Sequence, residues 1–222
     1  MSAGTPLKLA ILISGRGSNM SAIVQACRAG RIAAQVAVVI SDRADAGGLE
    51  RARALGVETV TLPAAPGSGN RFEQALTDAL NVHRPDAIAL AGFMRILSAP
   101  FVESYLGCML NIHPSLLPAY RGLHTHRRVL AARESEHGAS VHFVTAELDG
   151  GPVVLQSKVA VEPGDTETTL SARVQATEHI IYPEALGWLA QRRLVWRAGA
   201  AWLDGRRLDA PIVEDFRAAA LH

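Results

Sequence analysis

The chain has 222 residues, 49% of them hydrophobic and 19% charged, which is ordinary for a soluble globular protein with one sizeable core. Its net charge of +1 provides no electrostatic attraction to nucleic acid or to a membrane surface. No apolar run reaches the roughly 20 residues that span a bilayer, and the N-terminal MSAGTPLK lacks the pattern of a signal peptide. With only Cys27 and Cys108 and no disulfide scaffold, we expect a cytoplasmic protein with reduced thiols.

A glycine-rich turn follows the first predicted strand. The strand is the β-branched run at 7–13, the turn is ISGRGSN, and a helical pattern comes next. This order of elements points free backbone N–H groups at an anion, and Ser18 or Asn19 can cap the helix and bind a phosphate. Met20 stands where a dinucleotide fingerprint has its third glycine, and no Lys-Ser/Thr pair marks a triphosphate loop. A monophosphate site is favoured, with a plain strand-to-helix turn as the alternative.

Strands and helices then alternate along the first half of the chain. We expect strands at 35–40, 58–62 and 87–91 and one that ends at 113, with helices at 49–55, 72–83 and 100–105. Residues 63–70, rich in Gly, Pro and Ser, predict a surface loop. Alternation of this kind is typical of a parallel sheet with right-handed crossovers. Ligands in such sheets bind outside the carboxyl ends of the strands.

The second half of the chain predicts a different arrangement. Strands are expected at 138–144 and 153–161, separated by the Asp-Gly-Gly-Pro turn. Asp165 or Thr166 should cap a long helix that Pro183 kinks or splits. A small strand pair is expected at 194–196 and 200–202.

The stretch LNIHPSLLPAYRGLHTH (110–126) carries the chemistry. Asn111 and His113 stand two residues apart on a strand that Pro114 terminates, so both should project from one face. Asp149, on the turn after the next strand, can bring a carboxylate to the same edge. An amide and a protonated imidazole can stabilise an oxyanion, and a carboxylate can keep the imidazole protonated, which suits acyl transfer. Each residue also has an ordinary structural explanation, and spacing alone leaves both open.

A zinc centre is the second hypothesis for this stretch. His113, His124 and His126 supply three nitrogen ligands, and Asp149 would add an oxygen ligand. Two prolines lie in the gap after the first histidine, however, and the other two, at i and i+2, do not share a helix face.

Seven motifs, in order from Leu9 to Leu208, give the chain a family resemblance. They are ISGRGSN, LAGFMRIL, NIHPSLLP, GLHTH, SVHFVTAELDGGPV, RVQATEHIIYP and AAWLDG. Together they resemble the phosphoribosylglycinamide formyltransferases of purine synthesis. The resemblance implies a Rossmann-like, mostly parallel α/β sheet with helices on both faces and antiparallel strands in the C-terminal half. It also implies transfer of a formyl group from 10-formyltetrahydrofolate to the glycyl amine of glycinamide ribonucleotide.

The resemblance assigns roles residue by residue. The implied catalytic residues are Asn111, His113 and Asp149. The residues implied to bind the ribonucleotide are Gly17, Ser18, Asn19, Met20 and Glu178. The residues implied to contact the folate are Arg71, Met94, Arg95, Ile96, Leu97, Asn111, Ala146, Glu147, Leu148 and Asp149. His124 and His142 are implied to be supporting histidines near the site.

The resemblance also bears on organisation and partners. It implies one formyltransferase domain over 1–222, with a ribonucleotide phosphate-binding half at about 7–107 and a catalytic and folate-binding half at about 108–208. No metal is needed for this chemistry, and neither nucleic acid nor a membrane is an expected partner; the chain is expected to be a monomer or homodimer. Arg16 and Arg121 depart from the family pattern, the second replacing a proline before Gly122.

Three other functions compete with this interpretation. A formyltetrahydrofolate hydrolase uses a similar trio with water as acceptor, but such chains usually carry an N-terminal regulatory domain. Methionyl-tRNA formyltransferase needs a longer C-terminal domain and a basic surface, which a net charge of +1 disfavours. A nucleotide-binding module without catalysis would explain the glycine-rich turn but not His113 and Asp149.

Overall fold

A computed structural model describes residues 5–63 and 69–218. The strands are β1 (Leu7–Ile13), β2 (Ala34–Ser41), β3 (Thr59–Thr61), β4 (Ala87–Leu90), β5 (Met109–His113), β6 (Glu136–Phe143), β7 (Val153–Ala160), β8 (Leu194–Arg197), β9 (Ala200–Leu203), β10 (Arg206–Arg207) and β11 (Ile212–Asp215). The helices are α1 (Ser18–Arg28), α2 (Gly47–Ala54), α3 (Gly69–His83), α4 (Ala99–Ser104), α5 (Thr125–Ala132) and α6 (Glu167–Ala190). Most of the loop predicted at 63–70 lies outside the described residues.

The main sheet has eight strands in the order β11-β7-β6-β5-β4-β1-β2-β3. Strands β1 to β5 are parallel, and β6 runs antiparallel to both of its neighbours, β5 and β7. The strand order reverses between β1 and β4, which is the switch point where doubly wound sheets bind ligands. The mostly parallel α/β fold with antiparallel strands in the C-terminal half is confirmed.

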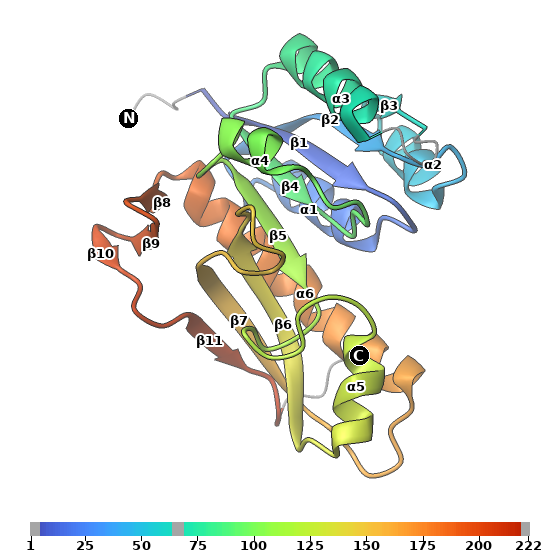
Figure 1. The fold of residues 1–222 in the computed structure, drawn as a ribbon, viewed down its shortest axis with the longest axis vertical. Helices are drawn as coiled ribbons and strands as arrows, with labels where there is room; N and C mark the ends of the chain where they lie inside the picture. Colours follow the sequence, from blue (N-terminus) through green and yellow to red (C-terminus); the bar gives the residue numbers. More distant parts are fainter. Residues whose placement is uncertain (1–4, 64–68, 219–222) are drawn as a thin grey trace.

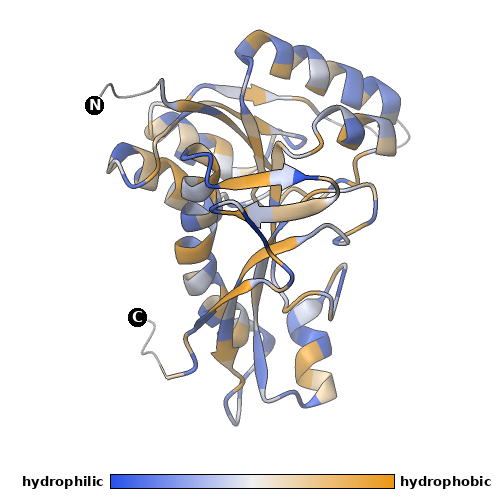
Figure 2. Ribbon diagram, turned by 90° about the vertical axis from the view of Figure 1, so that its left-hand side faces the viewer, coloured by the Kyte–Doolittle hydropathy of each residue, from blue (hydrophilic) through white to orange (hydrophobic). Residues whose placement is uncertain are grey.

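Both faces of the sheet are buried, because alternate residues of each central strand point to opposite sides. In β1, Leu9 and Ile11 pack in a cluster with α1 and α6, whereas Ala10 and Leu12 pack with α3 and α4. Helices α1, α2, α5 and α6 therefore cover one face and α3 and α4 the other (Figure 1). Figure 2 shows hydrophobic residues concentrated along the sheet strands.

The predicted elements of the sequence are present, with end points shifted by a few residues, and Thr166 caps α6 as expected. Pro183 does not split that helix, which is continuous from Glu167 to Ala190. Burial of Tyr182 and Ala185 on either side of the proline holds both halves of α6 against the sheet. The last strand, β11, was not predicted; it adds to the sheet edge by pairing with β7.

Strands β8, β9 and β10 form a separate antiparallel sheet. Trp196 of this small sheet packs edge-on against Phe143 of β6, with ring centroids 5.4 Å apart. Across residues 5–63 and 69–218, the structure contains no helix long and apolar enough to cross a membrane.

The close contact between β6 and β7 leaves no room for a side chain at Gly138. A Cβ atom there would lie 1.8 Å from the Ser157 carbonyl oxygen, so a Gly138→Ala chain must separate two paired strands. We expect a loss of about 3 kcal/mol or more in the free energy of unfolding, measured by urea denaturation. Gly187→Ala is the matched control, because its Cβ would meet only the Arg31 oxygen at 3.8 Å and a helix prefers alanine. Equal stability of the two variants would contradict the prediction.

Candidate active site

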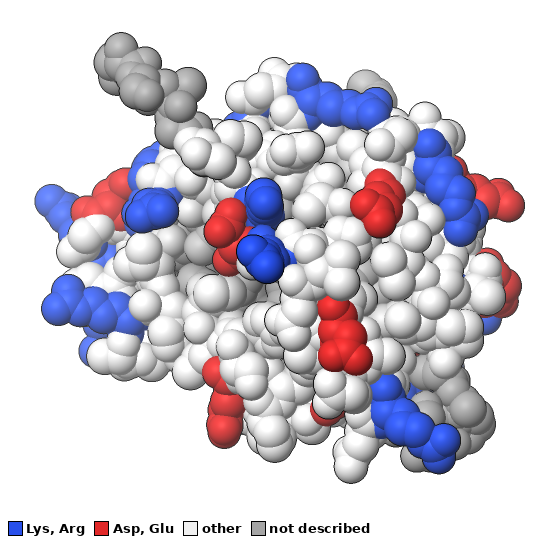
Figure 3. All heavy atoms as spheres, turned by 90° about the horizontal axis from the view of Figure 1, so that it is seen from above, with Lys and Arg blue, Asp and Glu red and all other residues white. Residues whose placement is uncertain are grey.

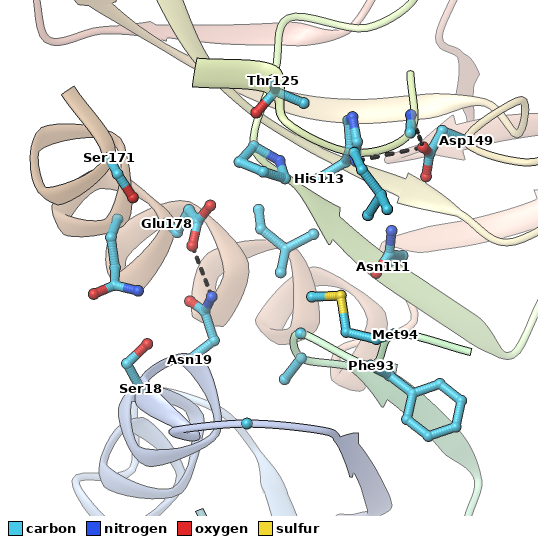
Figure 4. A pocket seen from close by; sticks show the side chains of 18 of the residues that line it. Ser18, Asn19, Phe93, Met94, Asn111, His113, Thr125, Asp149, Ser171 and Glu178 are labelled. Atoms are coloured by element: carbon cyan, nitrogen blue, oxygen red, sulfur yellow. Dashed lines mark hydrogen bonds and ion pairs between the residues drawn. The ribbon is translucent and has the colours of Figure 1, made fainter. Parts of the chain in front are cut away.

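A cavity of about 550 Å³ opens at the carboxyl ends of β1, β4 and β5. Five segments of the chain meet around it: the turn after β1, the loop after β4, the end of β5 with the start of α5, the loop between β6 and β7, and the first half of α6 (Figure 4). The cavity thus lies at the switch point of the sheet, where β1 and β4 are neighbours and their following loops diverge.

The glycine-rich turn forms one wall, with residues 15–19 all lining the cavity. Gly17 has a φ of 72°, and a Cβ there would come within 2.7 Å of the Gly48 Cα, so this position requires glycine. Helix α1 begins at Ser18, and its N-cap, Gly17, makes no side-chain cap. The prediction that Ser18 or Asn19 caps the helix is therefore wrong, and the first backbone N–H groups of α1 have no intrahelical partner.

The side chain of Asn19 is oriented by Glu178. Its Nδ2 donates to Glu178 Oε2 at 2.8 Å, although 159 residues separate the two in sequence. The amide oxygen of Asn19 is therefore turned away from the carboxylate and is buried without a partner among the described residues. Burial raises the pKa of the Glu178 carboxyl, and the hydrogen bond from Asn19 partly offsets this.

Thr125 lies at the start of α5. Its Oγ1, like the Asn19 oxygen, is buried without a hydrogen-bond partner in the described structure. Both Thr125 and Asn19 line the cavity (Figure 4). A buried polar atom without a partner costs about 1–3 kcal/mol, so two at one cavity indicate positions that a polar ligand satisfies. Thr125, Ser171 and Gln175 line the cavity but were not singled out from the sequence; only the GLHTH motif pointed to the first of them.

Asn111 is oriented by a chain of hydrogen bonds through His142. The Nδ1 of this buried histidine lies 2.9 Å from the Phe143 carbonyl oxygen, which can only accept, so Nδ1 carries the proton. Its Nε2 then accepts from Asn111 Nδ2 at 3.0 Å. Burial lowers the pKa of His142 to about 4, which keeps the ring neutral as this arrangement requires. One N–H of the Asn111 amide remains available to the cavity.

His113 faces an oxygen at each ring nitrogen. Its Nε2 lies 3.0 Å from the Tyr120 carbonyl oxygen, and its Nδ1 lies 3.4 Å from Asp149 Oδ2. Because neither oxygen can donate when the carboxylate is ionised, an imidazolium with two N–H groups satisfies both contacts. The side chains of His113 and Asp149 are each only 8% exposed, so this charge pair is held largely away from water.

Asp149 reaches this position because its loop folds back over the end of β5. The residue has a φ of 48°, and its Oδ2 accepts from the Gly122 N–H at 2.9 Å. An ion pair between Arg121 and Glu147 joins the same two loops. The Arg121 that departs from the family pattern thus connects the segment before α5 to the loop that carries the carboxylate.

The rim of the cavity carries exposed apolar side chains. Met94, Ile96, Leu123 and Leu148 are 68%, 78%, 69% and 52% exposed and all line the opening. Large hydrophobic side chains gathered at one rim are typical of a ligand-binding surface.

Some of the predicted site residues lie away from the cavity. Met20 is fully buried in the core, and Leu97 is buried in the cluster formed with α3 and α4. Arg71 is exposed on α3 outside the cavity lining, and Ala146 and Glu147 lie in the loop before the lining residue Leu148. His142 acts through Asn111, and His124 lines the cavity as the N-cap of α5.

The zinc hypothesis gains no support from the structure. Within the described ranges, no group of three or more His, Cys, Asp or Glu side chains could hold a metal ion. His126 instead pairs with His137, its Nδ1 3.0 Å from the partner Nε2.

Charges on the face shown in Figure 3 alternate in sign. Lys and Arg are interspersed with Asp and Glu, and no extended basic surface forms on that face. This distribution agrees with the small net charge of the chain.

The buried histidines predict how stability depends on pH. Burial lowers the pKa of His142 to about 4 and that of His137 to about 3. In the unfolded chain these rings titrate near pH 6.5, so below that pH the unfolded state binds more protons and the folded state loses stability. Urea unfolding at pH 7 and pH 5 should show the loss. His137→Gln should reduce the slope by up to about 1.4 kcal/mol per pH unit.

Comparing the variant with the wild-type chain isolates the histidine. Glu214, whose pKa is raised to about 7 mainly by burial, contributes with the opposite sign in the same range, but equally in both chains. Identical slopes for the two chains would contradict the assignment.

Comparison with known proteins places the chain in a family. Residues 7–186 match the family model described as formyl transferase. The phosphoribosylglycinamide formyltransferase of Escherichia coli (strain K12) is 53% identical over 203 residues, which are 91% of this chain and 96% of that protein. A solved phosphoribosylglycinamide formyltransferase from Coxiella burnetii has a TM-score of 0.89 at 47% identity, covering 94% of this chain and 99% of that one. The chain therefore belongs to the phosphoribosylglycinamide formyltransferase family.

Proposed function

We propose that the chain transfers a formyl group from 10-formyltetrahydrofolate to the glycyl amine of glycinamide ribonucleotide, a step of de novo purine biosynthesis. The observation that carries the proposal is one cavity in which an anion-binding turn, an apolar rim and the Asn111/His113/Asp149 trio meet. Relatives with that name and 53% identity support the choice of substrates.

The ribonucleotide binds on the side of α1 and α6. Its phosphate accepts from the backbone N–H groups of Ser18, Asn19 and Met20, so buried Met20 contributes through its backbone alone. The Asn19 side chain does not bind the phosphate, because its available atom is an acceptor. That oxygen and Glu178 instead take hydroxyl or amide protons of the ligand.

The folate binds against the apolar rim. Met94, Ile96 and Leu148 provide an exposed hydrophobic surface for a flat ring system. The guanidinium carbon of Arg95 lies 4.5 Å from the centroid of the Phe72 ring. This contact directs the Arg95 side chain toward α3. We assign the phosphate-binding half to about 7–107 and the catalytic and folate half to about 108–208. No metal enters the scheme.

The chemistry follows from the donors at the trio. The glycyl amine attacks the formyl carbon, a new C–N bond forms, and the bond from that carbon to folate N10 breaks. Asn111 Nδ2 donates to the oxyanion that develops on the formyl oxygen, and the positive charge of the His113 imidazolium, whose two N–H groups face Tyr120 and Asp149, stabilises it. Asp149 stabilises the imidazolium and accepts the proton that the amine loses, which passes to N10 of the leaving tetrahydrofolate. The products are formylglycinamide ribonucleotide and tetrahydrofolate.

Dependence on the acceptor tests this function. Purified protein should release tetrahydrofolate from 10-formyltetrahydrofolate only when glycinamide ribonucleotide is present, because the amine is the nucleophile. The absorbance change of the folate measures turnover, and mass spectrometry of the nucleotide measures the added formyl group. Equal turnover without the ribonucleotide would assign the chain to the hydrolases, and no turnover in either condition would refute the proposal.

Substitutions at the trio test the assigned roles. His113→Ala and Asp149→Ala should each lower kcat by roughly 10²-fold or more, within the range for oxyanion and acid–base groups. His83→Ala is the control, because that histidine lies at the end of α3, outside the cavity lining. Circular dichroism confirms that each variant is folded. Rates near wild type in either trio variant would refute the site assignment.

A further inference from the structure

Tyr182 is a fully buried side chain of α6 that joins two strands of the sheet. Its hydroxyl lies 3.1 Å from the Leu90 carbonyl oxygen and 2.9 Å from the Leu110 carbonyl oxygen. Both carbonyls can only accept, so the phenol is the shared donor. Burial raises the pKa of this phenol well above its usual value of 10, which keeps the donor proton in place.

The two carbonyls mark the point where β4 and β5 part. Leu90 is the last residue of β4 and pairs with Asn111 of β5. Beyond it, one chain enters the loop at 91–96 and the other continues as Asn111 and His113; both line the cavity. The hydroxyl therefore binds both strands near the end of their pairing, in addition to the ladder between them.

The loop after β4 is held from its other side by β1. Ser14 N donates to the Gly92 oxygen at 3.1 Å, and Met94 N donates to Ser14 Oγ at 2.9 Å. The loop that carries Met94 is thus bonded to Ser14. Leu90, the residue before this loop, is bonded to Tyr182.

Helix α6 links Tyr182 to the other half of the cavity. Glu178, one turn before Tyr182, accepts from Asn19 at the start of α1. The same helix therefore contacts the end of the glycine-rich turn, the last residue of β4 and the residue that precedes Asn111.

We propose that Tyr182 is a positioning residue: its hydroxyl fixes the spacing between the loop at 91–96 and Asn111, and so the fit of the formyl donor between them. The inference rests on the proposed function, because the formyl donor is the ligand assigned to that loop. Tyr182 touches neither substrate, since it is fully buried and outside the cavity lining.

Tyr182→Phe in the full chain tests the proposal, because it removes one oxygen atom and keeps the ring. We expect kcat/KM for 10-formyltetrahydrofolate to fall roughly tenfold or more, since misplacement of a positioned group by a fraction of an ångström has effects of that order. The Kd of tetrahydrofolate, measured by calorimetry, should rise in parallel. The KM of the ribonucleotide should stay within about twofold, because the turn after β1 keeps its own contacts.

Tyr105→Phe is the matched control. Tyr105 is half-buried beside Phe101, with ring centroids 4.9 Å apart, and lies outside the cavity lining. Its loss of a hydroxyl should leave the kinetics and the tetrahydrofolate affinity unchanged.

Two outcomes would overturn the proposal. One is a Tyr182→Phe chain with a lower Tm but wild-type kinetics and tetrahydrofolate affinity at a temperature well below that Tm. The other is a chain recovered only unfolded, which would make the hydroxyl a requirement of folding alone. A wild-type chain that binds no tetrahydrofolate would instead refute the proposed function, so the two failures are distinguishable.

Discussion

The contact of Asp149 with the end of β5 is the interaction on which the site depends. Without it, Asn111 and His113 would lie beside the apolar rim and the glycine-rich turn with no carboxylate next to them. The backbone N–H of Gly122 fixes one carboxylate oxygen at 2.9 Å, and the same oxygen faces His113 Nδ1. Both side chains are only 8% exposed, so the contact between them is nearly excluded from water.

The parallel part of the sheet explains why the site can be assembled from distant segments. Strands β1, β4 and β5 end at one edge, so the three loops that follow them become neighbours there. The loop after β1 is more than 70 residues from each of the other two in sequence. Side chains of α6 bond to Asn19 after β1, to Leu90 at the end of β4 and to Leu110 in β5. The core supplies rigidity and the loops supply chemistry, a division that is typical of α/β folds.

Much of the fold could be predicted from the sequence. Buried parallel strands read as short apolar runs and helices as 3.6-residue periods, so the strands from β1 to β9 and the helices other than α5 were placed to within a few residues. The exceptions depended on tertiary contacts: α6 stays continuous through Pro183 because both sides are buried, and β11 forms because β7 offers an unpaired edge. Of the site, the trio and the glycine-rich turn could be located by motif. Ser171 and Gln175 could not, because a serine and a glutamine inside a helix have no special pattern.

The direction of each hydrogen bond is the part of the site that sequence could not supply. An asparagine offers both a donor and an acceptor, and which one faces the cavity depends on the group that holds the other end. Glu178 takes the donor of Asn19 from 159 residues away and leaves an acceptor for the ligand, whereas His142 accepts from Asn111 and leaves a donor N–H. Two side chains of one kind thereby present opposite groups to the cavity, an acceptor oxygen from Asn19 and a donor N–H from Asn111. Because a neutral His142 is what makes the second orientation favourable, its burial is as much a part of the site as the groups that face the ligand.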